Sequence, residues 1–175
     1  MYICFMLNET EWLNFFGQRI LVATICGLIV GWERELKSKV AGIRTNVLVC
    51  VGSAILTSIA YIIKDEYAAT DPGRIIGQIV TGVGFLGGGV IFKMNDRVTG
   101  VTTASFIWIM AALGILAGMG FVLVPIVCTA GLIVLSLLFH ILERRIEKGV
   151  TERNERNGWA ANGNSCTKPE EKEML

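Results

Sequence analysis

The hydrophobic positions of this chain fall into five long segments separated by short polar connections. The segments are residues 15–32, 46–63, 74–92, 102–118 and 121–139. A helix needs roughly 17–25 predominantly apolar residues to cross the hydrocarbon core of a bilayer, and all five segments meet that requirement. The pattern therefore predicts an all-α, polytopic membrane protein, a bundle of five transmembrane helices. Only Met119 and Gly120 separate the last two segments, which predicts a tight helical hairpin, with a single kinked helix as the alternative.

Lysine and arginine residues gather in alternate connections between these segments. Residues 33–45 hold four of them, residues 64–73 hold one, residues 93–101 hold two, and the tail after His140 holds seven. An excess of Lys and Arg marks the cytoplasmic side of a membrane protein. This pattern predicts an N-terminus outside the membrane and a C-terminus in the cytoplasm.

The same pattern divides the chain into four parts. Residues 1–14 form a short extracytoplasmic segment, and residues 15–140 form the transmembrane domain. Residues 141–153 are expected to extend the fifth helix into the cytoplasm. From residue 154 the composition shifts to Asn, Gly, Ser and charged residues, which is typical of disorder, so we expect residues 154–175 to be a disordered tail.

Glycine is concentrated in the third segment. It occupies six positions there, Gly77, Gly82, Gly84, Gly87, Gly88 and Gly89. Each glycine inside a helix costs about 0.5–1 kcal/mol relative to alanine, but small residues let membrane helices approach closely. We therefore expect this helix to be buried among other helices. Pairs at GxxxG spacing extend the expected packing set to Gly27, Gly31, Gly82, Gly84, Gly87, Gly88, Gly114 and Gly118.

The run from Gly82 to Gly87 also satisfies the GxGxxG fingerprint of dinucleotide-binding proteins. That fingerprint requires a preceding strand and a following amphipathic helix. Here it lies in the middle of an apolar segment, so we expect no nucleotide and no other cofactor.

A few polar residues interrupt or border the apolar segments. A central arginine costs about 2.5–3.5 kcal/mol on insertion, so we expect Arg19 to pair with Asp71. The alternative, at equal weight, is that Arg19 extends to the headgroups without a protein partner. Asp71 before Pro72 is also typical of a helix N-cap followed by proline at the first helical position.

Other polar residues are expected to stabilise contacts between helices rather than to bind a ligand. Glu33 and Arg44 border the same short connection and are expected to meet and close a hairpin. Arg74 and Gln78 share one helix face at i, i+4 spacing. Four hydroxyls lie at the start of the fourth segment, of which one is expected to be its N-cap and others to bond to the third helix: Thr99, Thr102, Thr103 and Ser105.

No arrangement typical of an enzyme or a metal site is present in the sequence. Magnesium prefers oxygen ligands, usually carboxylates, and no Asp or Glu lies inside the apolar segments. The five cysteines show no metal-ligand spacing. No basic stripe with interleaved aromatic residues indicates a nucleic-acid partner. We therefore expect no catalytic residue, no metal site and no bound nucleic acid.

An ordered series of short motifs runs through residues 16–140. They read Gly31-Trp32-Glu33-Arg34-Glu35, Ala41-Gly42-Ile43-Arg44-Thr45-Asn46, Asp71-Pro72, Gly82-Val83-Gly84-Phe85-Leu86-Gly87-Gly88-Gly89 and Val98-Thr99-Gly100-Val101-Thr102-Thr103-Ala104. In this series the sequence resembles the MgtC/SapB family of bacterial membrane proteins. Ser105 stands where family members commonly have alanine. Many members continue into a soluble ACT-like C-terminal domain, for which we expect the tail here to be too short.

The resemblance implies an inner-membrane protein linked to growth at low Mg²⁺ and to bacterial survival inside host cells. It also implies that the chain modulates partner membrane machinery, with the F-type ATP synthase as the proposed target. The older family label, magnesium transporter, supplies the alternative: a cation carrier or its subunit, with Asp71 and Glu33 as ligands. Beyond the lipid bilayer, the expected partners are another membrane protein complex or a second copy of this chain.

Overall fold

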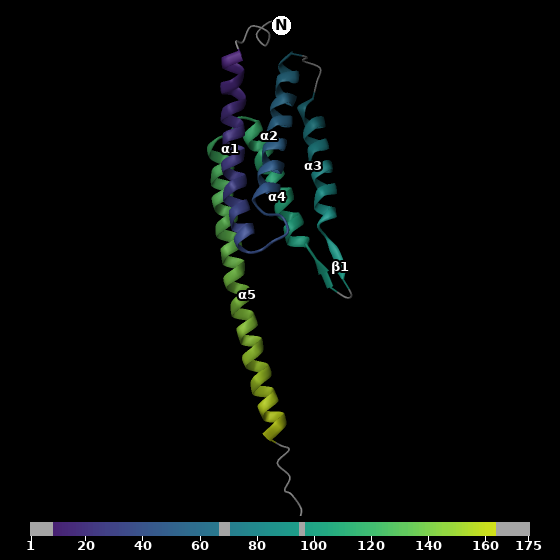
Figure 1. Ribbon diagram of the computed structural model, residues 1–175, viewed down its shortest axis with the longest axis vertical. Coiled ribbons are helices and arrows are strands. Elements are labelled where there is room, and N and C mark those ends of the chain that lie inside the picture. The colour runs from purple at the N-terminus through teal and green to yellow at the C-terminus, as the bar shows by residue number, and fades with distance from the viewer. Residues whose placement is uncertain (1–8, 67–70, 95–96, 164–175) are drawn as a thin grey trace, which may run out of the picture. The chain divides into compact units, whose positions relative to one another are not determined.

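The computed structural model describes residues 9–66, 71–94 and 97–163. Their elements are α1 (Glu9–Leu36), α2 (Ile43–Glu66), α3 (Pro72–Gly89), β1 (Phe92–Met94), β2 (Arg97–Thr99), α4 (Val101–Gly118) and α5 (Leu123–Gly163) (Figure 1). Each of the five predicted segments coincides with a helix. The predicted all-α membrane protein is thereby confirmed.

Within the described residues, four helices are long and apolar enough to cross a membrane: Glu9–Leu36, Ile43–Lys64, Val101–Gly118 and Leu123–Leu142. Helix α3 is not among them, and its sequence carries seven glycines together with Pro72, Arg74 and Gln78. The count of five spans and the orientation of the termini stay predictions.

Three boundaries differ from those expected. Helix α1 already begins at Glu9, and α5 remains helical to Gly163, beyond the point where disorder was expected. Phe92, predicted to end the third helix, instead begins an antiparallel hairpin in which it pairs with Thr99. The helix ends early because three consecutive glycines, residues 87–89, close it.

Gly100, between β2 and α4, is the N-cap of α4 and has a left-handed φ of 90°. A Cβ at this position would lie 1.9 Å from the carbonyl oxygen of Val90, so only glycine fits. No side chain caps α4. The expectation that Thr99, Thr102, Thr103 or Ser105 would do so is wrong, because the tight turn after the hairpin places glycine at the cap.

The chain divides into two units, residues 1–133 and residues 134–175. In the first unit, α2 packs against α1, α3 and α4, and Figure 1 shows it between α1 and α3. Buried apolar residues of α1 and α4 join α2 in one core cluster, which includes Val22, Val30, Phe106, Met110 and Leu113. The second unit consists of α5 from Val134 onward, whose apolar residues up to Leu142 are exposed, as is typical of lipid contact.

Glycine pairs on α1 and α4 bring both helices against the backbone of α2. A Cβ at Gly27 would lie 2.7 Å from Val47 Cα, and one at Gly31 would lie 2.6 Å from Ile43 Cα. On α4, a Cβ at Gly114 would lie 2.2 Å from the carbonyl oxygen of Cys50. A Cβ at Gly118 would lie 2.5 Å from the carbonyl oxygen of Ala54. No larger residue fits at these four positions without moving backbone.

The connection between α1 and α2 is held by two side chains. The Glu35 carboxylate accepts a hydrogen bond from the N–H of Ile43 at 3.1 Å, and so caps the first turn of α2. Gly42 leaves the room for it, because a Cβ there would overlap the carboxylate. The buried Asn46 amide donates to the carbonyls of Ala41 and Gly42 at 3.0 and 2.7 Å.

We expect Gly114→Ala and Gly118→Ala to lower the stability of the protein by about 1–3 kcal/mol each, as overpacking typically does. The thermal unfolding midpoint in detergent micelles would measure it. Gly84→Ala is the matched control, because nothing lies within 4 Å of its Cβ position, and it should leave the midpoint unchanged or raise it. Equal losses in all three variants would contradict the packing role.

Replacing Glu35 with alanine should cost about 0.5–2 kcal/mol, as loss of a helix cap does, while Glu35→Gln should cost less because its amide oxygen can still accept from Ile43 N. The free energy of unfolding would be measured in detergent. Lys39→Ala, an exposed change in the same connection, should have no effect. A loss with Lys39→Ala as large as with Glu35→Ala would disprove the cap.

Candidate functional site

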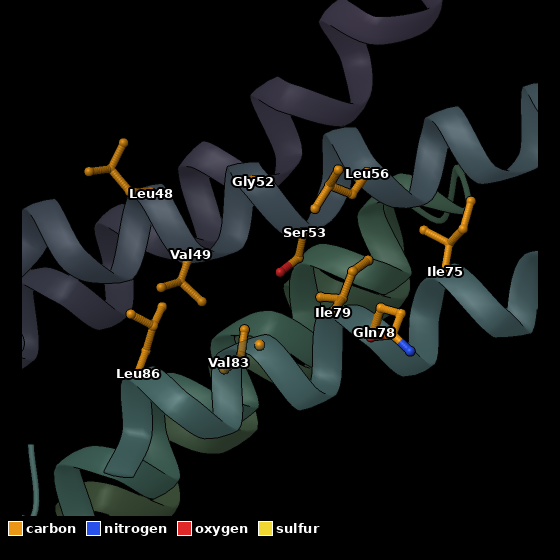
Figure 2. A pocket seen from close by; sticks show the side chains of 11 residues that line it. Leu48, Val49, Gly52, Ser53, Leu56, Ile75, Gln78, Ile79, Val83 and Leu86 are labelled. Carbon is orange, nitrogen blue, oxygen red and sulfur yellow. The ribbon is translucent and has the colours of Figure 1, made fainter. Parts of the chain in front are cut away.

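A groove of about 480 Å³ runs between α2 and α3. Figure 2 shows Val49 and Ser53 directed from α2 toward α3, and Val83 and Leu86 directed from α3 toward α2. Its walls are almost wholly apolar and are formed by Leu48, Val49, Gly52, Ser53, Leu56, Ile75, Gln78, Ile79, Gly82, Val83 and Leu86. The groove therefore suits an apolar chain or helix rather than a charged molecule.

The hydroxyl of Ser53 is a polar group in the otherwise apolar wall of this groove. Ser53 is only 3% exposed, and its hydroxyl makes no hydrogen bond to any described residue. Five other helix hydroxyls, those of Thr24, Ser58, Thr81, Ser105 and Thr129, each donate to the carbonyl four residues earlier. The buried Thr57 hydroxyl of α2 also lacks a partner among the described residues, but it does not line the groove. Ser53 is thus left with a donor for a group that enters the groove.

Most glycines of α3 have no neighbour in the described part of the chain. Nothing lies within 4 Å of a Cβ built at Gly77, Gly82, Gly84, Gly88 or Gly89. Gly87 alone among the helix's glycines after Gly73 meets another helix, at 3.6 Å from Ala104 Cβ. Phe85, on the same helix, is 82% exposed.

The prediction that α3 is buried among other helices is therefore wrong. Only Ile79, Val83 and Gly87 are buried, because α3 contacts α2 and α4 along one face only. Gly82, Gly84 and Gly88, expected to pack against helices of this chain, instead form an open surface beside the groove.

A second polar cluster joins the end of α1 to α4. Glu33 forms an ion pair with Arg34, with 2.5 Å between Arg34 Nε and Glu33 Oε2, and also pairs with Lys37. The Arg34 guanidinium lies 3.7 Å from the centre of the Phe106 ring. Glu33 and Arg34 are both buried, so their charges are neutralised within the protein.

Glu33 does not close the hairpin with Arg44 as expected. Its carboxylate instead pairs with Arg34 and with Lys37, and Lys37 lies at the favourable i, i+4 spacing on the same helix. Arg44 itself is exposed at the start of α2.

Arg19 also has a different partner from the one predicted. Its Nη1 donates to the carbonyl of Gly118 at 2.7 Å, and its guanidinium lies 3.6 Å from the centre of the Phe15 ring. Asp71 instead accepts from the N–H of Gly73 at 2.8 Å and caps α3, with Pro72 following as predicted. Arg19 thus connects α1 to α4 and not to α3.

The remaining predicted residues lie apart from one another. Arg74 and Gln78 are both exposed on α3, and only Gln78 lines the groove. Thr102 is exposed at the start of α4, whereas Thr103 is buried. No group of three or more His, Cys, Asp or Glu side chains able to hold a metal occurs among the described residues.

Sequence reasoning did not single out Arg34 or Ser53 as site residues, although helical spacing could have indicated both. Arg34 stands seven residues after Gly27 and three after Gly31, spacings that place it on the same buried face of α1 as these glycines. Ser53 stands seven residues after the buried Asn46 and three after Cys50, on the small-residue face of α2.

The sequence profile of the MgtC family matches residues 20–145. The chain is similar to a protein of Escherichia coli K12 named putative magnesium transporter YhiD, with 38% identity over 76% of this chain and 64% of the relative. It is also similar to Protein MgtC of Brucella abortus, with 37% identity over 71% of this chain and 51% of that protein. Protein SapB of Bacillus subtilis is 43% identical over 57% of this chain and 46% of its own length.

The chain spans about half to two thirds of the length of these curated relatives. No solved structure is significantly similar to it. Its bacterial relatives and its apolar helices together identify a multi-pass protein of the bacterial inner membrane, and the chain belongs to the MgtC family.

Proposed function

We propose that this protein binds another membrane protein through the groove and the open glycine surface of α3, and thereby modulates that partner during adaptation to low magnesium. The names of its relatives, MgtC and putative magnesium transporter YhiD, support the link to magnesium. The family resemblance supports a large membrane assembly, such as the F-type ATP synthase, as the partner. No enzymatic activity is part of this proposal.

The observation that supports it is the open glycine surface itself. Each interior glycine costs a helix about 0.5–1 kcal/mol relative to alanine. On α1 and α4 that cost is offset by close packing on α2, but Gly77, Gly82, Gly84 and Gly88 of α3 gain no such contact. In lipid, glycine surfaces serve the close approach of another helix. A partner helix on α3 would supply the missing contact.

The groove beside this surface suits the same partner. Gly52 and Gly82 leave open space on its two sides, so that the backbone of a third helix could come near. The free Ser53 hydroxyl would donate to a carbonyl or side-chain oxygen of that helix, which is a common polar contact between membrane helices. A partner with an apolar helix that carries small residues therefore fits best.

Cation transport is the second candidate, supported by the name of the YhiD relative. The carboxylates proposed as its ligands are engaged elsewhere, since Glu33 pairs with Arg34 and Lys37 while Asp71 caps α3. An apolar groove with one hydroxyl and one amide offers few of the oxygen ligands that Mg²⁺ needs. These contacts favour partner binding over transport.

Replacing Gly82 or Gly84 with leucine should prevent the partner helix from approaching. We expect each variant to retain its thermal unfolding midpoint, because leucine favours helix, and to lose about 5- to 150-fold in partner affinity, which corresponds to an overpacking cost of about 1–3 kcal/mol. Co-purification of the ATP synthase from cross-linked cells, together with growth at low Mg²⁺, would measure the loss.

Gly17→Leu on α1 is the matched control, because Gly17 is also open to its surroundings but lies away from the groove. It should co-purify the partner as the unaltered protein does. If Gly82→Leu and Gly84→Leu do so too and support growth equally well, the proposed surface is refuted.

Purified protein in liposomes should show no Mg²⁺ flux above that of empty liposomes, because the groove lacks carboxylate ligands. A fluorescent Mg²⁺ indicator inside the vesicles would report entry. Robust flux that Asp71→Ala abolishes and Arg74→Gln preserves would establish the transporter function in place of the partner-binding one.

A further inference from the structure

A small cavity lies between α1 and the turn that joins α4 to α5. It has a volume of about 150 Å³, and its lining includes Phe15, Gln18, Arg19, Gly120 and Phe121. It is separate from the α2–α3 groove and plays no part in the function proposed above.

Arg19 enters this cavity with most of its donors unused. A guanidinium group carries five N–H donors, and the bond to Gly118 occupies Nη1 alone. The Phe15 ring supports one face of the guanidinium. On the side of the turn, a Cβ at Gly120 would lie 3.4 Å from Nη2, so the absence of a side chain there leaves the group accessible.

The described contacts of Arg19 include no carboxylate. Among the side chains that the structure describes, Glu33 pairs with Arg34 and Lys37, Glu35 accepts from Ile43 N and Asp71 caps α3, whereas Arg19 donates to a backbone carbonyl. Gln18 adds an exposed amide to the same cavity. A half-buried cation with free donors and a neighbouring amide offers the donors that an oxyanion requires.

The position of the cavity along the helices places it near a membrane surface. The reversal of the chain at Gly120, where φ is 94°, marks one end of the α4–α5 hairpin. On α1, Arg19 precedes the buried Arg34 by fifteen residues, which is about 22 Å of helix. The apolar span of α4 ends at Gly118, whose carbonyl Arg19 binds, and the end of a spanning helix lies where the phosphates of the headgroups begin.

We infer that this cavity binds the phosphate of an anionic phospholipid, held by Nε and Nη2 of Arg19 and by the amide of Gln18. A fork of two parallel N–H donors matches two phosphate oxygens. A phosphodiester without a cationic headgroup gains the full attraction of Arg19, whereas a zwitterionic headgroup brings its own positive charge. Soluble phosphate shares the oxyanion chemistry, and the experiment distinguishes the two sources.

The test compares the full chain in nanodiscs of phosphatidylcholine alone with nanodiscs that also contain phosphatidylglycerol. A ligand that binds only the folded state raises the unfolding midpoint, so we expect phosphatidylglycerol to raise it by several degrees. In parallel, inorganic phosphate or glycerol phosphate is added to the protein in a neutral detergent. A shift with lipid alone supports a headgroup site, whereas an equal shift with soluble phosphate would assign the site to that anion and overturn the lipid inference.

Gln18→Glu is the decisive variant, because it places a carboxylate beside Arg19 and leaves the bond from Arg19 to Gly118 in place. It should abolish the phosphatidylglycerol shift and reduce the number of anionic lipids retained in native mass spectra. Arg19→Gln is less informative, since it also removes the hydrogen bond to the Gly118 carbonyl of α4. Arg74→Gln, an exposed change on α3, should keep the full shift. An undiminished shift in Gln18→Glu, or no shift in the unaltered protein, would overturn the inference.

Discussion

The bundle is held together by the close approach of two helix backbones, those of α1 and α4, to the backbone of α2. Gly27 and Gly31 of α1 meet one side of α2, and Gly114 and Gly118 of α4 meet another. Where α4 approaches, the α2 residues are small as well, as with Cys50 and Ala54, both fully buried. Because lipid is as apolar as leucine, membrane helices associate through such close packing rather than through burial of large apolar residues.

Two arginines of α1 then fix how α1 and α4 lie along one another. Arg34 meets Phe106 near the start of α4, and Arg19 donates to the carbonyl of Gly118 at its end. The Gly118 carbonyl also accepts from Ser58 of α2. One backbone oxygen therefore connects three helices, which is possible only because residue 118 has no side chain to separate them.

Helix α3 packs differently from its neighbours, although its composition is similar. It is richer in glycine than α1 or α4, yet it contacts α2 and α4 with a single face and leaves its remaining glycines open. The same residue type thus serves internal packing in one part of the molecule and an external surface in another. The open glycines of α3 and the groove beside them are for this reason the proposed contact surface for a partner.

The amino-acid pattern alone was enough to predict the helices, their apolar character and the family, because hydrophobic periodicity and span length are local properties. It also indicated the Asp71 cap and the GxxxG pairs on α1 and α4. Packing in the folded chain sets the partners of Arg19 and Glu33, the exposure of α3 and the free hydroxyl of Ser53. These depend on which helix faces lie against one another, and spacing along one helix gives its faces without saying which neighbour each of them meets.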